Sequence, residues 1–272
     1  MAPTPSGPKV WRWGRWVPQS TSSPPAADIA GLRFFEFNMC GSVCNKGDVG
    51  GVVDAIRDSV LSFQPDIVLL NEACLAQVDR LWEVLNGRGY STTACFGAST
   101  GRSDCPGVEG ERWFGNAVLS RGVGIGAPEM LALPNRPNLA EQRSIISMAA
   151  ELRGVPALVS ATHLTPRSKD ETYNRLQITE LARIQNERAE GGNIVVFGGD
   201  FNATPDQVRE IYAPTGRFAE VDSADNEPTF KTYKIDYIFL GVPRFANLTG
   251  DATSSSWSDH RPLRGSATLK AG

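Results

Sequence analysis

Short apolar runs that end in polar residues recur along this sequence, and they constrain the fold more than any other feature. The run at 66–72 (DIVLLNE) ends in an acid, and the run at 193–202 (NIVVFGGDFN) ends in an aspartate and an asparagine. Both runs are typical of buried β-strands. Further strands are predicted at 32–38, 115–121, 144–152, 156–164, 234–240 and 266–269.

Helical patterns alternate with these strands. Apolar residues recur at three- and four-residue spacing in 52–63, and amphipathic patterns follow at 75–87 and 171–189. Strands and helices alternate in the same way in the two halves of the sequence, and no low-complexity linker separates the halves. We therefore predict one domain at 31–272. An α/β (α+β) arrangement follows, in which two sheets pack face to face and helices lie outside.

Residues 1–30 differ from the rest in composition. They are rich in Pro and Ser and contain the segment WRWGRW at 11–16. We predict a flexible arm over 1–30. Its tryptophans could stack on bases or sugars, but packing of the indoles onto the domain is the favoured interpretation.

The overall charge narrows the function classes. The formal net charge is -3, which argues against a protein that holds nucleic acid by bulk electrostatics. It leaves room for an enzyme that meets phosphate through a local cationic groove or a metal ion. No stretch of eighteen apolar residues occurs, so no membrane-spanning helix is expected.

All five cysteines lie in the first 105 residues. Cys95 and Cys105 flank a Gly- and Ser-rich loop, where a disulfide would restrain the chain. Cys44 and Cys74 follow two predicted strands and could also pair, which would leave Cys40 odd. Disulfides predict a secreted protein; five reduced thiols in a cytoplasmic protein are the alternative.

Polar residues mark the ends of the predicted strands, where burial is costly unless a partner is present. Six such sites indicate that the strand ends converge on one cleft. They are Asn38, Glu72, His163, Asp200 with Asn202, Asp236, and Asp259 with His260.

These residue types suit the cleavage of a phosphate ester. Carboxylates are ligands for Mg²⁺ or Mn²⁺, and no Cys/His cluster points to another metal. Two histidines with nearby carboxylates can act as base, acid or phosphate contact. Asparagines can hold a phosphate or a water without adding negative charge.

Six runs along the chain match the ordered motifs of a known family. They are PDIVLLNE (65–72), GNAVLSR (115–121), ATHL (161–164), GGDFNATP (198–205), KIDYIF (234–239) and SDHRPL (258–263). With these runs, the sequence resembles the endonuclease/exonuclease/phosphatase superfamily with the DNase I-like fold over about residues 32–270. The cysteines in MCGSVC (39–44) and NEAC (71–74) resemble those of its extracellular actinobacterial members. The resemblance implies a four-layer α/β sandwich of two mixed sheets between helices.

The resemblance also implies roles for single residues. Glu72 would be the principal Mg²⁺ ligand, with Asn38 near metal or phosphate and Asp259 completing the metal environment. Asp200 would orient or deprotonate the attacking water, and Asn202 would hold the phosphate.

The remaining roles concern the two histidines and one arginine. His260, polarised by Asp236, would contact the scissile phosphate, and His163 would help to protonate the leaving group. Arg143 would contact the phosphate, although a salt bridge at the surface is an equal alternative.

The substrate is less constrained than the reaction. The motif GDFNATP and the presence of His163 resemble DNase-type nucleases, so a monomeric, non-specific nuclease is the leading hypothesis. A cationic groove of Arg112, Arg143, Arg167 and Lys169 would support it. A phosphomonoesterase or a lipid phosphodiesterase is the alternative. A non-catalytic binding protein or toxin subunit on the same fold is the third possibility.

Overall fold

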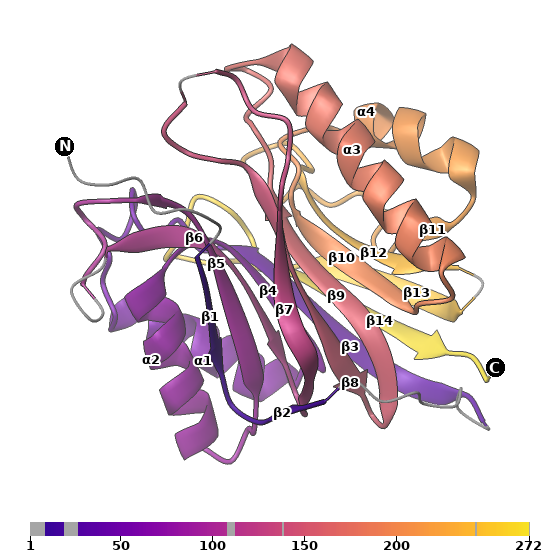
Figure 1. Ribbon diagram of the computed structural model, residues 1–272, viewed down its shortest axis with the longest axis horizontal. Helices are drawn as coiled ribbons and strands as arrows, with labels where there is room; N and C mark the ends of the chain where they lie inside the picture. Colours follow the sequence, from indigo (N-terminus) through magenta and orange to yellow (C-terminus); the bar gives the residue numbers. More distant parts are fainter. Residues whose placement is uncertain (1–8, 19–26, 108–111, 138, 243, 272) are drawn as a thin grey trace.

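Two mixed β-sheets pack face to face and are covered by helices on both outer sides (Figure 1). The computed structural model describes residues 9–18, 27–107, 112–137, 139–242 and 244–271. The predicted four-layer α/β sandwich is confirmed. One sheet has the strand order β1 (Val10–Trp13), β5 (Thr93–Gly101), β6 (Trp113–Ser120), β4 (Ile67–Cys74), β3 (Ile29–Asn38), β14 (Leu263–Leu269) and β13 (Phe245–Ala252). The other has the order β11 (Phe218–Glu220), β12 (Asp236–Gly241), β10 (Val195–Asp200), β9 (Val155–His163), β8 (Ser144–Leu152), β7 (Gly124–Ala132) and β2 (Trp16–Val17).

The helices cover the outer faces of the two sheets. In Figure 1, α1 and α2 lie beside the first sheet, and α3 and α4 lie beside the second. Apolar side chains spaced by three or four residues form the buried face of α1, as the sequence predicted. The described helices are α1 (Gly51–Phe63), α2 (Leu75–Gly87), α3 (Glu171–Glu190), α4 (Pro205–Tyr212) and a 3₁₀ turn (Ala213–Thr215).

The core is divided by the sheets, and β3 shows how. Leu32 and Phe34 belong to the apolar cluster between the sheets, whereas Phe35 and Phe37 belong to the cluster under α1 and α2. Successive side chains of a strand point to opposite faces, so one strand supplies both clusters. Burial on both faces explains why the central strands carry so few polar residues before their ends.

The N-terminal segment is part of the sheets rather than a flexible arm over residues 10–17. β1 pairs antiparallel with β5, and β2 pairs parallel with β7. Trp11 packs edge-on against Phe96 with ring centroids 5.8 Å apart, and the Trp13 indole donates to Asp79 at 2.7 Å. The favoured packing of the indoles is therefore confirmed. The rest of the predicted arm lies partly outside the described residues, and the boundary at residue 30 stays a prediction.

The predicted disulfide pairs are wrong. Cys40 is bonded to Cys44, Cys74 is bonded to Cys105, and Cys95 is a free, buried thiol. Cys95 lies in β5 and its side chain enters the core between the sheets, so it points away from Cys105, which packs with Cys74. Sequence spacing did not reveal which face of β5 carries the thiol.

No described helix is long and apolar enough to cross a membrane.

Candidate active site

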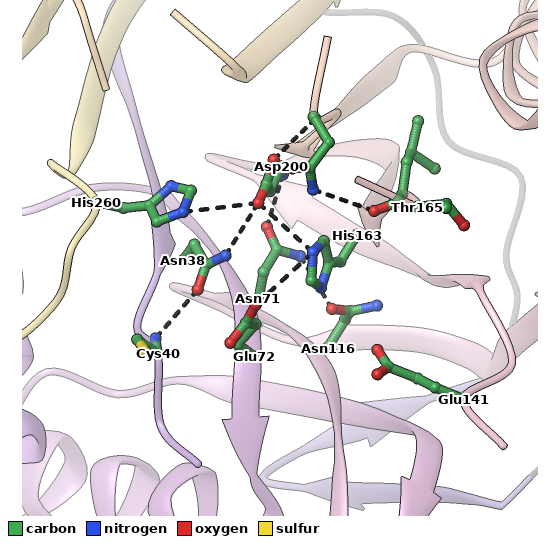
Figure 2. Close-up of polar contacts among 12 residues, drawn as sticks. Asn38, Cys40, Asn71, Glu72, Asn116, Glu141, His163, Thr165, Asp200 and His260 are labelled. Atoms are coloured by element: carbon green, nitrogen blue, oxygen red, sulfur yellow. Dashed lines mark hydrogen bonds and ion pairs between the residues drawn. The ribbon is translucent and has the colours of Figure 1, made fainter. Parts of the chain in front are cut away.

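Strand register gathers the predicted site residues at one end of the sandwich. In the second sheet, Asp200 at the end of β10 lies opposite His163 of β9 and Asp236 of β12. In the first sheet, Asn38 at the end of β3 lies opposite Asn71 of β4. The two groups face each other across the space between the sheets (Figure 2).

A hydrogen bond joins the two sheets at this point. The Asn38 amide donates to Asp200 Oδ2 at 3.0 Å, and Asn38 Oδ1 accepts from the Cys40 backbone N–H at 3.1 Å. Both ends of the Asn38 side chain are therefore used, which fixes its orientation. The loop closed by the Cys40–Cys44 disulfide thus holds a residue of the site in place.

Glu72 owes its direction to an irregularity of β4. The register between β4 and β6 shifts between Leu70 and Ala73, and Glu72 has a positive φ of 52°. A bulge of this kind turns one side chain out of the regular alternation, and such backbone strain occurs often at functional sites. The Glu72 carboxylate lies 3.8 Å from His163 Nε2. Burial raises the pKa of Glu72.

Asp200 is the centre of the cluster. Its Oδ2 lies 3.5 Å from His163 Nε2 and 3.8 Å from His260 Nε2, and its Oδ1 accepts the Asn202 backbone N–H at 2.8 Å. Burial and the charge of Asp236 raise the pKa of Asp200 to about 7. A carboxyl group with a pKa near neutrality is suited to exchange a proton with water.

The two histidines have opposite electrostatic environments. Burial alone would lower the pKa of His260. The negative charge of Asp236, and the hydrogen bond that His260 Nδ1 donates to Asp236 Oδ2 at 2.9 Å, instead raise this pKa to about 10. Burial and the positive charge of Arg143 instead hold the pKa of His163 well below its usual value. At neutral pH, His260 is therefore a cation and His163 is neutral.

Gly199, directly before Asp200, allows β10 to lie close to Thr162 of β9 and Asn71 of β4. A Cβ on Gly199 would lie 1.9 Å from the Thr162 carbonyl oxygen and 3.0 Å from Asn71 Oδ1. Gly199 also has a φ of 137°, which side-chain-bearing residues rarely adopt. The position of Asp200 therefore depends on the residue before it.

Asn71 belongs to the hydrogen-bonded cluster, and the sequence analysis missed it. It is fully buried, its Oδ1 accepts the Asp200 backbone N–H at 2.9 Å, and its amide donates to Asn116 at 3.0 Å and to the Thr162 carbonyl at 2.8 Å. It thus fixes the backbone of Asp200 from the opposite sheet (Figure 2). A polar residue inside the apolar run DIVLLNE was the available signal.

Glu36 was also missed. It is fully buried between the sheets, two residues before Asn38 on the same face, and neither carboxylate oxygen has a hydrogen-bond partner among the described residues. Burial, with the charges of Asp236 and Asp200, raises the pKa of Glu36 well above its usual value. Burial of this unpaired acid near Asp236 and Asp200 therefore favours its protonated form.

Asp259 lies outside the group of possible ligand atoms formed by Asp200, Asp236 and His260. Its side chain is exposed, and its Oδ1 lies 3.7 Å from Cys44 Sγ. Asn202 lies closer to Asp200, to which its backbone N–H donates, but its side-chain amide donates to the Leu164 carbonyl at 3.1 Å. The expected roles of these two residues, on metal and phosphate respectively, stay predictions.

Three of the four cationic residues that were expected to form a groove already have partners within the protein. The Arg143 guanidinium is buried against His163 and Glu141, and Arg167 forms an ion pair with Glu171. Arg112 donates to the carbonyls of Ser103 and Cys105. Lys169 is exposed. The phosphate contact predicted for Arg143 is not tested, and its guanidinium already has two partners.

The donor atoms of the cluster suit a hard divalent cation. Possible ligand atoms of Asp200, Asp236 and His260 lie within 4.8 Å of one another. His260 as a cation has no lone pair for a metal ion, so the remaining donors are the oxygens of the two aspartates and those of Glu72 and Asn38 beside Asp200. Such oxygen-rich sets are typical of Mg²⁺ and Mn²⁺. A second group, Cys40, Cys44 and Asp259, meets the same distance criterion, but its sulfurs are joined in a disulfide and are not thiolate ligands.

A family model covers most of the chain. Residues 36–260 match the Endonuclease/Exonuclease/phosphatase family. The chain belongs to this family. The family includes metal-dependent phosphoesterases, and the predicted resemblance is confirmed. Among curated protein sequences, none matches this chain.

Solved structures show the same fold. An endonuclease/exonuclease/phosphatase from Beutenbergia cavernae has a TM-score of 0.70 and 23% identity, over 90% of this chain and 72% of that chain. The human Nocturnin catalytic domain with bound sulfate has a TM-score of 0.65 and 17% identity, over 90% and 97% of the two chains. D. rerio TDP2 complexed with a single-strand DNA product has a TM-score of 0.63 and 15% identity, over 89% and 100%.

Proposed function

We propose that this protein is a Mg²⁺- or Mn²⁺-dependent phosphodiesterase that cleaves nucleic acid. The observation that carries the proposal is the convergence of acids, amides and two unlike histidines from both sheets on Asp200 (Figure 2). One histidine is a cation and the other is neutral, which suits a site that binds a phosphate and activates water. The DNA product bound to D. rerio TDP2 supports a nucleic-acid substrate on this fold.

The residues divide into roles as follows. Glu72 and Asn38 would hold the cation, which when bound supplies positive charge beside the phosphate oxygens. Asp200 orients the attacking water and takes its proton. His260, held as a cation by Asp236, contacts a non-bridging phosphate oxygen.

Cellular location and assembly are part of the proposal. Two disulfides are compatible with an oxidising compartment, so we propose that the protein acts as a secreted monomer. Expression in a reducing and in an oxidising compartment, followed by thiol titration, tests the location through the oxidation state.

The test of the function is a cleavage panel on the purified protein. Plasmid DNA, RNA, sphingomyelin, a phosphoinositide and a small phosphomonoester are incubated with Mg²⁺, with Mn²⁺ and with excess EDTA. We expect metal-dependent cleavage of the nucleic acids, lost in EDTA. Turnover of only a lipid or a monoester would support phosphoester hydrolysis but refute nucleic acid as the substrate.

Matched variants separate the site from general effects of mutation. Glu72→Gln and His260→Ala should each lower kcat by about 10²-fold or more, the scale of losing one charge-stabilising or proton-transferring group. Glu83→Gln removes an exposed carboxylate that pairs with Arg80 on α2 and should leave activity unchanged. Unchanged activity in the first two variants would refute the site, and a wild type inactive on every substrate would support a non-catalytic protein.

A further inference from the structure

Arg143 and His163 form a buried pair at the edge of the active site. Arg143 Nη1 lies 2.9 Å from His163 Nδ1, and the two residues are 9% and 6% exposed. A guanidinium has only donors and keeps its proton in proteins. Arg143 therefore donates, and His163 Nδ1 accepts with its lone pair.

This hydrogen bond determines which nitrogen of His163 carries the proton. With Nδ1 acting as an acceptor, a neutral imidazole has its hydrogen on Nε2. Nε2 points into the site, 3.5 Å from Asp200 Oδ2 and 3.8 Å from Glu72 Oε1 (Figure 2). Both distances exceed that of an ordinary N–H···O hydrogen bond, so this N–H can donate to an oxygen of a ligand.

Neighbouring residues hold the guanidinium in place. Glu141 Oε1 lies 2.7 Å from Arg143 Nη1, and the other oxygen of Glu141 lies 3.1 Å from Arg102. The Arg143 carbonyl accepts the Leu133 backbone N–H at 2.9 Å, directly before β8 begins. Arg143 is therefore anchored at its backbone and its side chain, and a move from His163 to the substrate would break the ion pair with Glu141.

We propose that Arg143 is a positioning residue that fixes His163 as a neutral Nε2–H donor. His163 then donates a hydrogen bond to a non-bridging oxygen of the substrate phosphate and transfers no proton to the leaving oxygen, which takes its proton from water. This assignment replaces the leaving-group role expected from sequence, and it rests on the proposed phosphodiesterase function.

Nuclear magnetic resonance tests the tautomer without any need for activity. The chain has only two histidines, so a ¹⁵N-labelled sample has four imidazole nitrogens, and a His260→Gln variant assigns them. In the full-length protein with Mg²⁺ at neutral pH, we expect His163 to be protonated at Nε2 and unprotonated at Nδ1. A proton on Nδ1 of the wild type overturns the proposal.

Arginine variants test whether residue 143 imposes the tautomer. Arg143→Met removes the donor and should allow a proton on Nδ1, whereas Arg143→Lys keeps a side chain that only donates and should restore the wild-type pattern. Circular dichroism and thermal melting show whether each variant is folded. A wild-type tautomer in a folded Arg143→Met variant would overturn the positioning role.

Kinetics test what His163 does in the reaction. His163→Ala is compared with the wild type on two phosphodiesters, one with an alkoxide and one with a p-nitrophenolate leaving group. A donor to a non-bridging oxygen predicts the same fold-loss of kcat/KM on both substrates. A leaving-group acid predicts a further loss of about 10²–10⁴-fold on the alkoxide substrate alone, which would overturn the proposal.

The positioning role predicts an effect on kcat rather than on KM. Arg143→Met should lower kcat by about 10- to 100-fold, the range known for hydrogen-bond partners of metal-ligating histidines, and Arg143→Lys should recover most of it. A rise in KM without a fall in kcat would instead place Arg143 on the substrate. If no substrate is cleaved by the wild type, the proposed function fails while the tautomer experiment still decides the structural claim.

Discussion

The two disulfides close chain loops of very different length, and this difference sets what each contributes to stability. Cys74 and Cys105 are 31 residues apart, whereas Cys40 and Cys44 are 4 apart. A disulfide stabilises mainly by restricting the unfolded chain, and the effect grows with loop length. Removal of the long-range disulfide should therefore destabilise the protein more.

The magnitudes follow from the loop lengths. The chain-entropy relation gives about 3.7 kcal/mol for the separation of 31 and about 1.9 kcal/mol for the separation of 4 at 25 °C. At about 2–4 °C per kcal/mol for a chain of this size, Cys74→Ala/Cys105→Ala should lower Tm by about 7–15 °C. Cys40→Ala/Cys44→Ala should lower it by about 4–8 °C.

The assays are urea unfolding, which gives the free energies, and thermal melting, which gives Tm, on both double variants made in a Cys95→Ala background. Cys95 is the one unbonded cysteine of the five, so this background prevents disulfide exchange and also serves as the reference protein. Thiol titration of the unfolded wild type should find one thiol. Equal losses of unfolding free energy in the two double variants would refute the loop-length argument, and more than one thiol would refute the pairing.

Three further substitutions test the packing around the site. Asn71→Leu should lower the unfolding free energy by roughly 3 kcal/mol in urea, because its buried partners lose their hydrogen bonds; an unchanged midpoint would contradict this. Lys234→Met should cost about 3–5 kcal/mol near neutral pH, since it leaves the buried carboxylates of its ion pairs uncompensated. Burial already raises the pKa of Glu220, so Glu220 becomes protonated and loses its charge as the pH falls through this raised pKa towards 4.5. The destabilisation that comes from Glu220 should therefore shrink over that pH range, and a pH-independent loss of stability would contradict this explanation. Gly199→Ala should destabilise the protein by more than about 4 kcal/mol, because the new Cβ would overlap the Thr162 carbonyl. Gly192→Ala is the control: it also has a positive φ but no atom within 4 Å of the new Cβ, so it should cost about 1–2 kcal/mol. Similar melting temperatures for the two variants would refute the steric argument.

Strands that end in functional residues were predictable because burial and chemistry leave a local signature. The strands ending at Asn38, His163 and Asp200 were found within a few residues of their observed bounds. Each is an apolar run with a polar end, and that pattern needs no knowledge of the fold. The helices at 51–63, 75–87 and 171–190 were found from their periodicity for the same reason.

Several elements were missed because tertiary contacts rather than local pattern form them. β5 and β7 contain glycine and polar residues that weaken strand periodicity, and β1 and β2 add to sheet edges formed by chain segments far along the sequence. α4 begins with a capping box at Thr204 and lasts only eight residues, too short for a clear periodic pattern.

The sequence by itself determined the family, the two-sheet architecture and the set of acids, amides and histidines at the strand ends, because each is encoded in a short run of adjacent residues. Only the tertiary structure decided which cysteines pair, that Asn71 and Asn38 fix Asp200 from the opposite sheet, and that Arg143 faces His163. These contacts join residues far apart in the chain. Their geometry depends on sheet register and on a bulge at Glu72, which the order of residue types does not specify.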